Sequence, residues 1–71
     1  MDFAIILTTV SAAEEGQSIA NTLVEKQLAA CVNIIPKISS VYQWEGQIQS
    51  ESEVLLLIKT TKDLEPEVYR E

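Results

Sequence analysis

Hydrophobic and polar residues follow two different periods along the first part of the chain. Segment 3–9 is almost continuously apolar and rich in branched side chains, which predicts a central β-strand buried on both faces. Apolar residues then recur with the period of a helix, which predicts an amphipathic helix that ends near Leu28. The predicted buried face of this helix comprises Gly16, Ile19, Ala20, Leu23, Val24 and Leu28.

Local signals indicate how this helix begins and how it packs. Ser11 and Glu14 have the spacing of a capping box, in which the hydroxyl and the carboxylate each bind a free backbone N–H group. We therefore expect the helix to begin just after Ser11. Gly16 lowers helix stability, and we interpret it as the position where the helix lies close to the sheet.

The pattern after the helix predicts one long β-hairpin. Segment 30–36 is typical of a strand, and Pro36 lacks an N–H donor, so we expect a kink, a bulge or an edge position there. Strand character continues from Ile38 to Trp44. Glu45-Gly46 is a turn signal, because glycine readily takes a positive φ, and a third strand is expected from Gln47 to Thr60.

The end of the chain predicts the start of a second helix. Val54 to Ile58 is apolar on both faces of the third strand, and Thr61-Lys62-Asp63 ends that strand. We expect Asp63 to cap the following helix, with Pro66 in its first turn. The predicted elements follow the order of a split βαβ unit: strand, helix, strand, turn, strand and the start of a helix. We therefore predict an α+β, ferredoxin-like fold. Residues 1–71 then form a single domain that is incomplete at its C-terminus, because a full second helix and the fourth strand are missing.

The hairpin is long for so small a domain. A strand from Gln47 to Thr60 spans roughly 40 Å, whereas the radius of gyration of a domain of this size is only about 11–13 Å. The tip should therefore extend beyond the core, and it carries Val41, Tyr42 and Trp44. Because exposed apolar edges invite association, we predict that the hairpin pairs with another copy of the chain.

Composition and charge exclude several classes of partner. The formal net charge of −6 argues against binding to nucleic acid or to anionic membranes, whose affinity depends on basic residues. The longest apolar run has five residues, against the roughly 20 that a membrane-spanning helix needs. Cys31 is the only cysteine, so no disulfide forms within the chain, and the N-terminus has no basic signal-peptide region. These features favour a cytoplasmic protein.

The residues present do not complete an enzyme active site. The chain has no histidine, which excludes Ser-His-Asp and Cys-His catalysis and the common Cys/His zinc sites. It has no glycine-rich phosphate-binding loop, since its two glycines are far apart. We therefore expect a binding protein and no catalytic residues.

Four positions remain as candidates for a binding site. Cys31 is either a small buried residue on a strand or a soft ligand for copper or another transition metal, in which case its partners must come from elsewhere. Glu51 and Glu53 share one strand face, either as cation ligands or, more simply, as a solvated surface. Lys59 either pairs with an anion or keeps its ammonium group in solvent.

Tyr42 and Trp44 also share a strand face. Large aromatic residues at a hairpin tip either anchor an interface or stack on a ligand, and an interface is the simpler interpretation. Together with the turn residues Glu45 and Gly46, they form the predicted contact region of the hairpin.

Four ordered blocks of sequence resemble the CutA family, the divalent-cation tolerance proteins. They are Leu28-Ala29-Ala30-Cys31-Val32-Asn33, Ile35-Pro36, Tyr42-Gln43-Trp44-Glu45-Gly46 and Glu53-Val54-Leu55-Leu56-Leu57-Ile58-Lys59-Thr60-Thr61. The predicted strand and helix before Leu28 fit the same layout, so the resemblance covers nearly the whole chain.

The resemblance implies a subunit related in architecture to the PII signalling proteins and assembled as a homotrimer through its long hairpins. It also implies a role in tolerance of divalent cations and binding of copper, without an established reaction. Cys31 matches the family's cysteine, a proposed metal ligand whose partners would follow Glu71. The alternative is a PII-like trimeric signalling or scaffold module with incidental metal binding. An acylphosphatase-like hydrolase is disfavoured, because segment 8–11 lacks the arginine that such chemistry requires.

Overall fold

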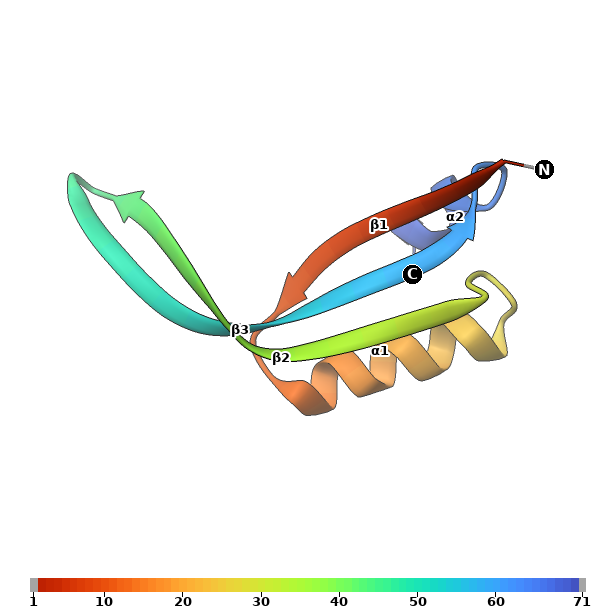
Figure 1. The fold of residues 1–71 in the computed structure, drawn as a ribbon, viewed down its shortest axis with the longest axis horizontal. Coiled ribbons are helices and arrows are strands. Elements are labelled where there is room, and N and C mark those ends of the chain that lie inside the picture. Colours follow the sequence, from red (N-terminus) through yellow and green to blue (C-terminus); the bar gives the residue numbers. More distant parts are fainter. Residues whose placement is uncertain (1, 71) are drawn as a thin grey trace.

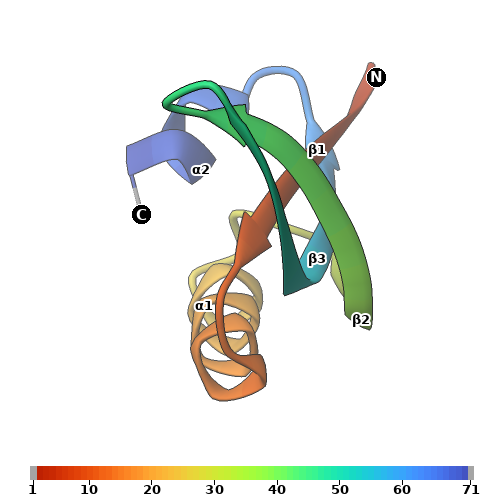
Figure 2. The ribbon, with the colours of Figure 1, turned by 90° about the vertical axis from the view of Figure 1, so that its left-hand side faces the viewer.

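The fold is one three-stranded antiparallel sheet with both helices packed on the same face (Figures 1 and 2). The computed structural model describes residues 2–70. Its elements, in chain order, are β1 (Phe3–Val10), α1 (Ala13–Glu25), β2 (Cys31–Trp44), β3 (Gln47–Thr61) and α2 (Glu65–Arg70). This order of elements confirms the prediction of a split βαβ, α+β arrangement.

β3 is the central strand of the sheet. The strand order is β1-β3-β2, so the first strand of the chain lies at an edge among the described residues. The prediction of a central first strand buried on both faces is therefore wrong. Only the side chains of β1 that point toward the helices are covered; Phe3, Ile5 and Leu7 point the other way and are 75%, 65% and 62% exposed.

The N-terminus of α1 is not a capping box. Ala12 occupies the N-cap position with an extended backbone and makes no side-chain capping bond. The first backbone bond of the helix runs from the Gly16 amide to the Ala12 carbonyl at 3.2 Å. Ser11 therefore lies one position too early to cap, and the expected pairing of Ser11 with Glu14 is wrong.

α1 ends three residues before the expected end at Leu28. Gln27 takes a φ of 59°. Its amide donates to the Val24 carbonyl at 3.0 Å, and the Leu28 amide donates to the Leu23 carbonyl at 2.9 Å. This pair of bonds is a Schellman motif, which satisfies the last carbonyls of a helix. Leu28 still packs against the core, so the hydrophobic period continued beyond the helix itself.

The helix packs on the sheet through its small residues. Gly16, Ala20 and Leu23 are buried, as predicted, but Val24 is 44% exposed and does not belong to the buried face. A Cβ atom on Gly16 would lie 3.1 Å from Leu56 Cδ2. The interpretation of Gly16 as a point of close approach is therefore confirmed.

The core lies between the helices and the sheet. Its buried members are Ile6, Leu23, Ala29, Val54, Leu56, Ile58 and Val68. The buried hydroxyl of Thr60 donates to the Leu28 carbonyl at 2.6 Å, which ties the end of β3 to the loop after α1. α2 begins at Glu65 and is preceded by Leu64, so the expected capping position of Asp63 is wrong. Pro66 lies in the first turn of α2, as predicted.

The β2–β3 hairpin extends beyond the core, as its length predicted. The molecule measures 43 × 23 × 17 Å, and Figure 1 shows the hairpin turning away from the three-stranded sheet. Glu45 and Gly46 have φ angles of 51° and 77°, which suit a type I′ turn. The pairing register shifts between Ile35 and Ile38, where Lys37 has a φ of 61°. This bulge confirms the expectation for Pro36.

We predict that Gly16→Val destabilises the fold by about 1–3 kcal/mol, because its side chain would push Leu56 and Val10 apart. Urea unfolding followed by circular dichroism at fixed protein concentration measures this change. Ser18→Val, at an exposed position of the same helix, reports the helix-propensity effect alone. Equal unfolding midpoints for the two variants would contradict the close packing of α1 on β3.

Candidate functional site

The predicted site residues fall into two groups at opposite ends of β2. Cys31 is the first residue of that strand, and Lys59 is its pairing partner on β3. Tyr42 and Trp44 lie at the other end, beside the Glu45-Gly46 turn. The structure therefore brings Cys31 and Lys59 together and keeps them apart from the hairpin tip.

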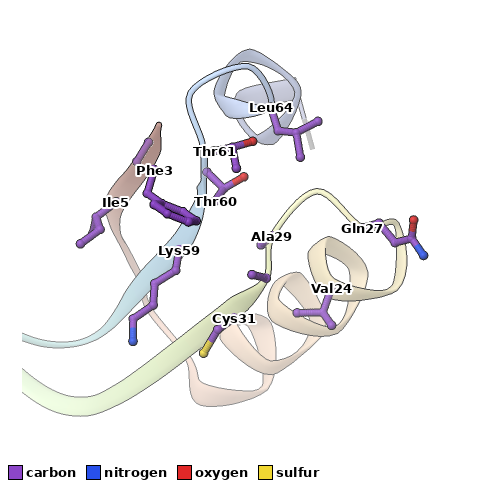
Figure 3. Close-up of a pocket in the computed structure, with 12 residues that line it drawn as sticks. Phe3, Ile5, Val24, Gln27, Ala29, Cys31, Lys59, Thr60, Thr61 and Leu64 are labelled. Atoms are coloured by element: carbon purple, nitrogen blue, oxygen red, sulfur yellow. The ribbon is translucent and has the colours of Figure 1, made fainter. Parts of the chain in front are cut away.

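Cys31 is a half-buried free thiol on the sheet face that the helices leave uncovered. Residues that pair across a sheet share a face, so Cys31, Lys59 and Ile5 form one row. The thiol donates a weak bond to Asn33 Oδ1 at 4.0 Å. Figure 3 shows the Cys31 sulfur and the Lys59 ammonium group pointing the same way, away from Thr61 and Leu64.

The described part of one chain offers too few donors for a metal centre. Among residues 2–70, no group of three or more histidine, cysteine, aspartate or glutamate side chains is placed to hold an ion. Cys31 is a soft ligand of the kind that copper prefers, but one thiolate does not fix a coordination geometry. The residues present in one copy therefore do not fit a complete copper site.

A hydrogen bond orders the polar face of the hairpin. The Tyr42 hydroxyl donates to Glu51 Oε1 at 2.7 Å. This bond raises the pKa of Tyr42, with smaller contributions from desolvation and from the negative charges of Glu51 and Glu53. One oxygen of the Glu51 carboxylate thus accepts from a phenol, and both groups are exposed. Trp44 is 63% exposed.

The sequence did not predict an exposed apolar surface on the sheet face opposite the helices. We call it the open face; its apolar members are Phe3, Ile5, Leu7, Ile35, Leu55 and Leu57. The sequence showed that these side chains are apolar, but only the packing of both described helices on the other face shows that the helices leave them uncovered.

A cavity of about 680 Å³ lies next to this face, between the ends of α1, β1 and β3 (Figure 3). Its walls are mainly apolar and include Phe3, Val24, Ala29 and Leu64. The Thr61 hydroxyl is buried without a hydrogen-bond partner at this cavity. Cys31 and Lys59 form one side of it, but their polar atoms point away, so the cavity offers little polar recognition.

Comparison with known proteins identifies one family. Residues 4–71 match the family model described as "CutA1 divalent ion tolerance protein". The chain is 53% identical over 60 residues to "Protein CutA, chloroplastic" of Arabidopsis thaliana, covering 84% of this chain and 33% of that protein. It is 45% identical over 64 residues to "Divalent-cation tolerance protein CutA" of Thermus thermophilus, covering 90% of this chain and 62% of that protein.

Solved structures agree with the sequence matches. The structure of the "Periplasmic divalent cation tolerance protein CutA" from Archaeoglobus fulgidus superposes with a TM-score of 0.88 at 41% identity, over 96% of this chain and 66% of that one. The ferredoxin-like, PII-like fold predicted from the sequence is therefore confirmed. The chain spans between one third and two thirds of the length of these relatives.

The names of these relatives bear on the expected function and on the expected location. Two of the three names describe divalent-cation tolerance and none names a reaction, and two place the relative in a chloroplast or a periplasm. The comparisons thus give no support to the expected cytoplasmic location. Within residues 2–70, neither helix has the length and apolar character needed to cross a bilayer.

We predict that Glu51→Gln lowers the pKa of Tyr42 toward its ordinary value of about 10, because the variant loses the charged acceptor. Spectrophotometric titration in a Tyr69→Phe background isolates Tyr42, since the chain has two tyrosines. The raised pKa means that the bond stabilises the fold below about pH 10 and that this contribution is lost as pH rises through the folded-state pKa.

Glu53→Gln is the matched control for this titration. Glu53 acts on Tyr42 only through its charge, which is the smallest of the causes, so this variant should lower the pKa less. An unchanged Tyr42 pKa in Glu51→Gln would contradict the hydrogen bond.

Proposed function

Because the chain belongs to the CutA1 divalent ion tolerance family, we propose that it acts in tolerance of divalent cations as a homotrimer that binds copper. Membership of this family, already indicated by the resemblance of Leu28 to Thr61, is the observation that carries the proposal. We further propose that residues 1–71 form one domain, that it acts in the cytoplasm, and that it works by binding and assembly without catalysis.

Self-assembly is supported by the open face. Phe3, Ile5 and Leu7 are more than half exposed, and Leu7 pairs with the half-buried Leu57 of β3 on the same face. Contiguous apolar surfaces of this kind mark interaction sites in soluble proteins. A small chain that covers only one side of its sheet gains stability by covering the other side with copies of itself.

Copper binding is supported by the position of Cys31. Its thiol is accessible at the edge of the open face, and thiolates favour Cu(I) among the biological metals. Within residues 2–70 Cys31 is the only sulfur donor, so we propose that the remaining ligands come from outside the described part of one copy. Cys31 would supply one soft ligand to the ion, and its pairing partner on β3 is Lys59.

One observation favours the alternative of a PII-like trimeric signalling or scaffold module. The part of the chain that the structure describes contains no cluster of metal-ligating side chains. On this alternative, assembly is the functional property and metal binding is incidental. The two proposals share the trimer and differ in whether Cys31 determines copper affinity.

We predict that the chain runs in multi-angle light scattering at three times its mass of 7.9 kDa. Leu7→Lys should weaken association by at least about 100-fold, since it buries a charge in the interface. Gln17→Lys, which adds the same charge at an exposed position on α1, should leave the mass unchanged. A trimeric Leu7→Lys variant would show that the open face is not the interface.

We predict that Cys31→Ala weakens Cu(I) binding by at least about tenfold, measured by competition with a chromophoric Cu(I) chelator under reducing conditions. Glu51→Gln controls for loss of an acidic side chain and should bind as the parent does. Unchanged Cu(I) affinity in Cys31→Ala would favour the signalling or scaffold alternative and exclude Cys31 as a ligand.

A further inference from the structure

The cavity beside the open face differs in charge from the rest of the chain. The sequence has eleven acidic residues against five basic ones, which gives a formal net charge of −6. Among the described residues that line the cavity, none is acidic and Lys59 is the only basic residue. Lys59 is exposed, and no carboxylate within residues 2–70 forms an ion pair with it. The cavity therefore carries an unneutralised positive charge in an otherwise acidic molecule.

The rest of the cavity wall suits an apolar molecule. Phe3 and Val24, which are 75% and 44% exposed, line the cavity together with Ala29 and Leu64. Its volume of about 680 Å³ lies within the range of about 300–1,000 Å³ that is typical of small-molecule sites. Such walls stabilise an occupant by removing its apolar surface from water. We therefore expect most of the binding free energy to come from an apolar body.

Two polar groups indicate how an occupant would lie. The stem of the Lys59 side chain forms one side of the cavity, and its ammonium group points away from Thr61 and Leu64 (Figure 3). An anionic group would therefore lie at the outer rim, with the apolar body pointing inward. The Thr61 hydroxyl is buried at the cavity and has no partner in the described residues. Because buried polar atoms rarely stay unpaired, this hydroxyl is available to one polar atom of the occupant.

We propose that this cavity binds a small amphipathic carboxylate, with the carboxylate group on Lys59 and an aromatic or aliphatic body against Phe3 and Val24. Charge complementarity favours an anion, since Lys59 has no carboxylate partner within residues 2–70. The apolar wall disfavours strongly hydrated polyanions, because it offers little to replace their hydration. The site needs neither copper nor the homotrimer, so it goes beyond the proposed function.

A matched pair of ligands tests the proposal on the parent chain. Phenylbutyrate has an aromatic body and a carboxylate group, and phenylbutanol replaces that group with a neutral hydroxyl. Amide NMR titration of residues 1–71 locates each ligand through the signals of Ala30, Lys59 and Thr61, which line the cavity. We expect both ligands to shift these signals saturably, and the acid to bind about fivefold more tightly than the alcohol.

Three variants separate the charge from the cavity. Lys59→Met removes the charge and keeps most of the stem, so it should bind phenylbutyrate about fivefold more weakly and phenylbutanol as the parent does. Lys62→Met is the matched control, because Lys62 is exposed in the turn after β3 and does not line the cavity. It should leave both affinities unchanged. Val24→Trp fills the cavity from an exposed position and should weaken both ligands by at least about tenfold.

Three results would overturn the proposal. The first is the lack of a saturable shift at the cavity signals with phenylbutyrate. The second is an equal affinity of phenylbutyrate for the parent and for Lys59→Met, which would remove the role of the charge. The third is a shift of the same amide signals when the free protein is diluted, since this would show that a second copy fills the cavity. The first two results would leave the homotrimer and copper binding untouched.

Discussion

The apolar stretch Val54–Ile58 of β3 imposes the main physical constraint on this molecule, because it needs cover on both sides of the sheet. On one side, Val54, Leu56 and Ile58 are buried by the two helices, and Gly16 allows α1 to approach closely. On the other side, Leu55 and Leu57 have only their neighbours in the sheet. Among the described residues no second layer covers this side, so the apolar side chains of the open face point outward. This one-sided packing is the physical basis of the proposed self-assembly.

Local chemistry made much of the hairpin predictable. The turn follows from Glu45-Gly46, the bulge from the missing donor of Pro36, and the bounds of β3 from a long apolar and alternating pattern. The predictions that were wrong depended on the exact position of one residue or on contacts between distant parts of the chain. Ser11 is one position away from the N-cap, and Gln27 adopts a left-handed conformation that glycine would have signalled. The edge position of β1 is a property of strand order, which no local pattern contains.

The candidate site shows the same division. Cys31, Lys59, Tyr42 and Trp44 could each be nominated from residue type and position. The contacts between these residues could not be predicted, because the pairing of Cys31 with Lys59 and the Tyr42–Glu51 bond depend on the register of two long strands. The open face is a third case, since its members were recognised as apolar but were expected to be covered. A site built from the face of a sheet is thus harder to read from sequence than one built from a contiguous motif.

The bulge on β2 also reconciles two competing registers. Counting back from the Glu45-Gly46 turn along regular strands would place Cys31 opposite Thr60, whose side chain is buried beneath the helices. The extra residue moves the inner half of β2 by one position, so that Cys31 faces Lys59 and the neighbouring Val32 faces Ile58 in the core. The one extra residue in the bulge therefore decides which side chains of inner β2 face the helices. It places the Cys31 thiol on the open face and the Val32 side chain toward the core.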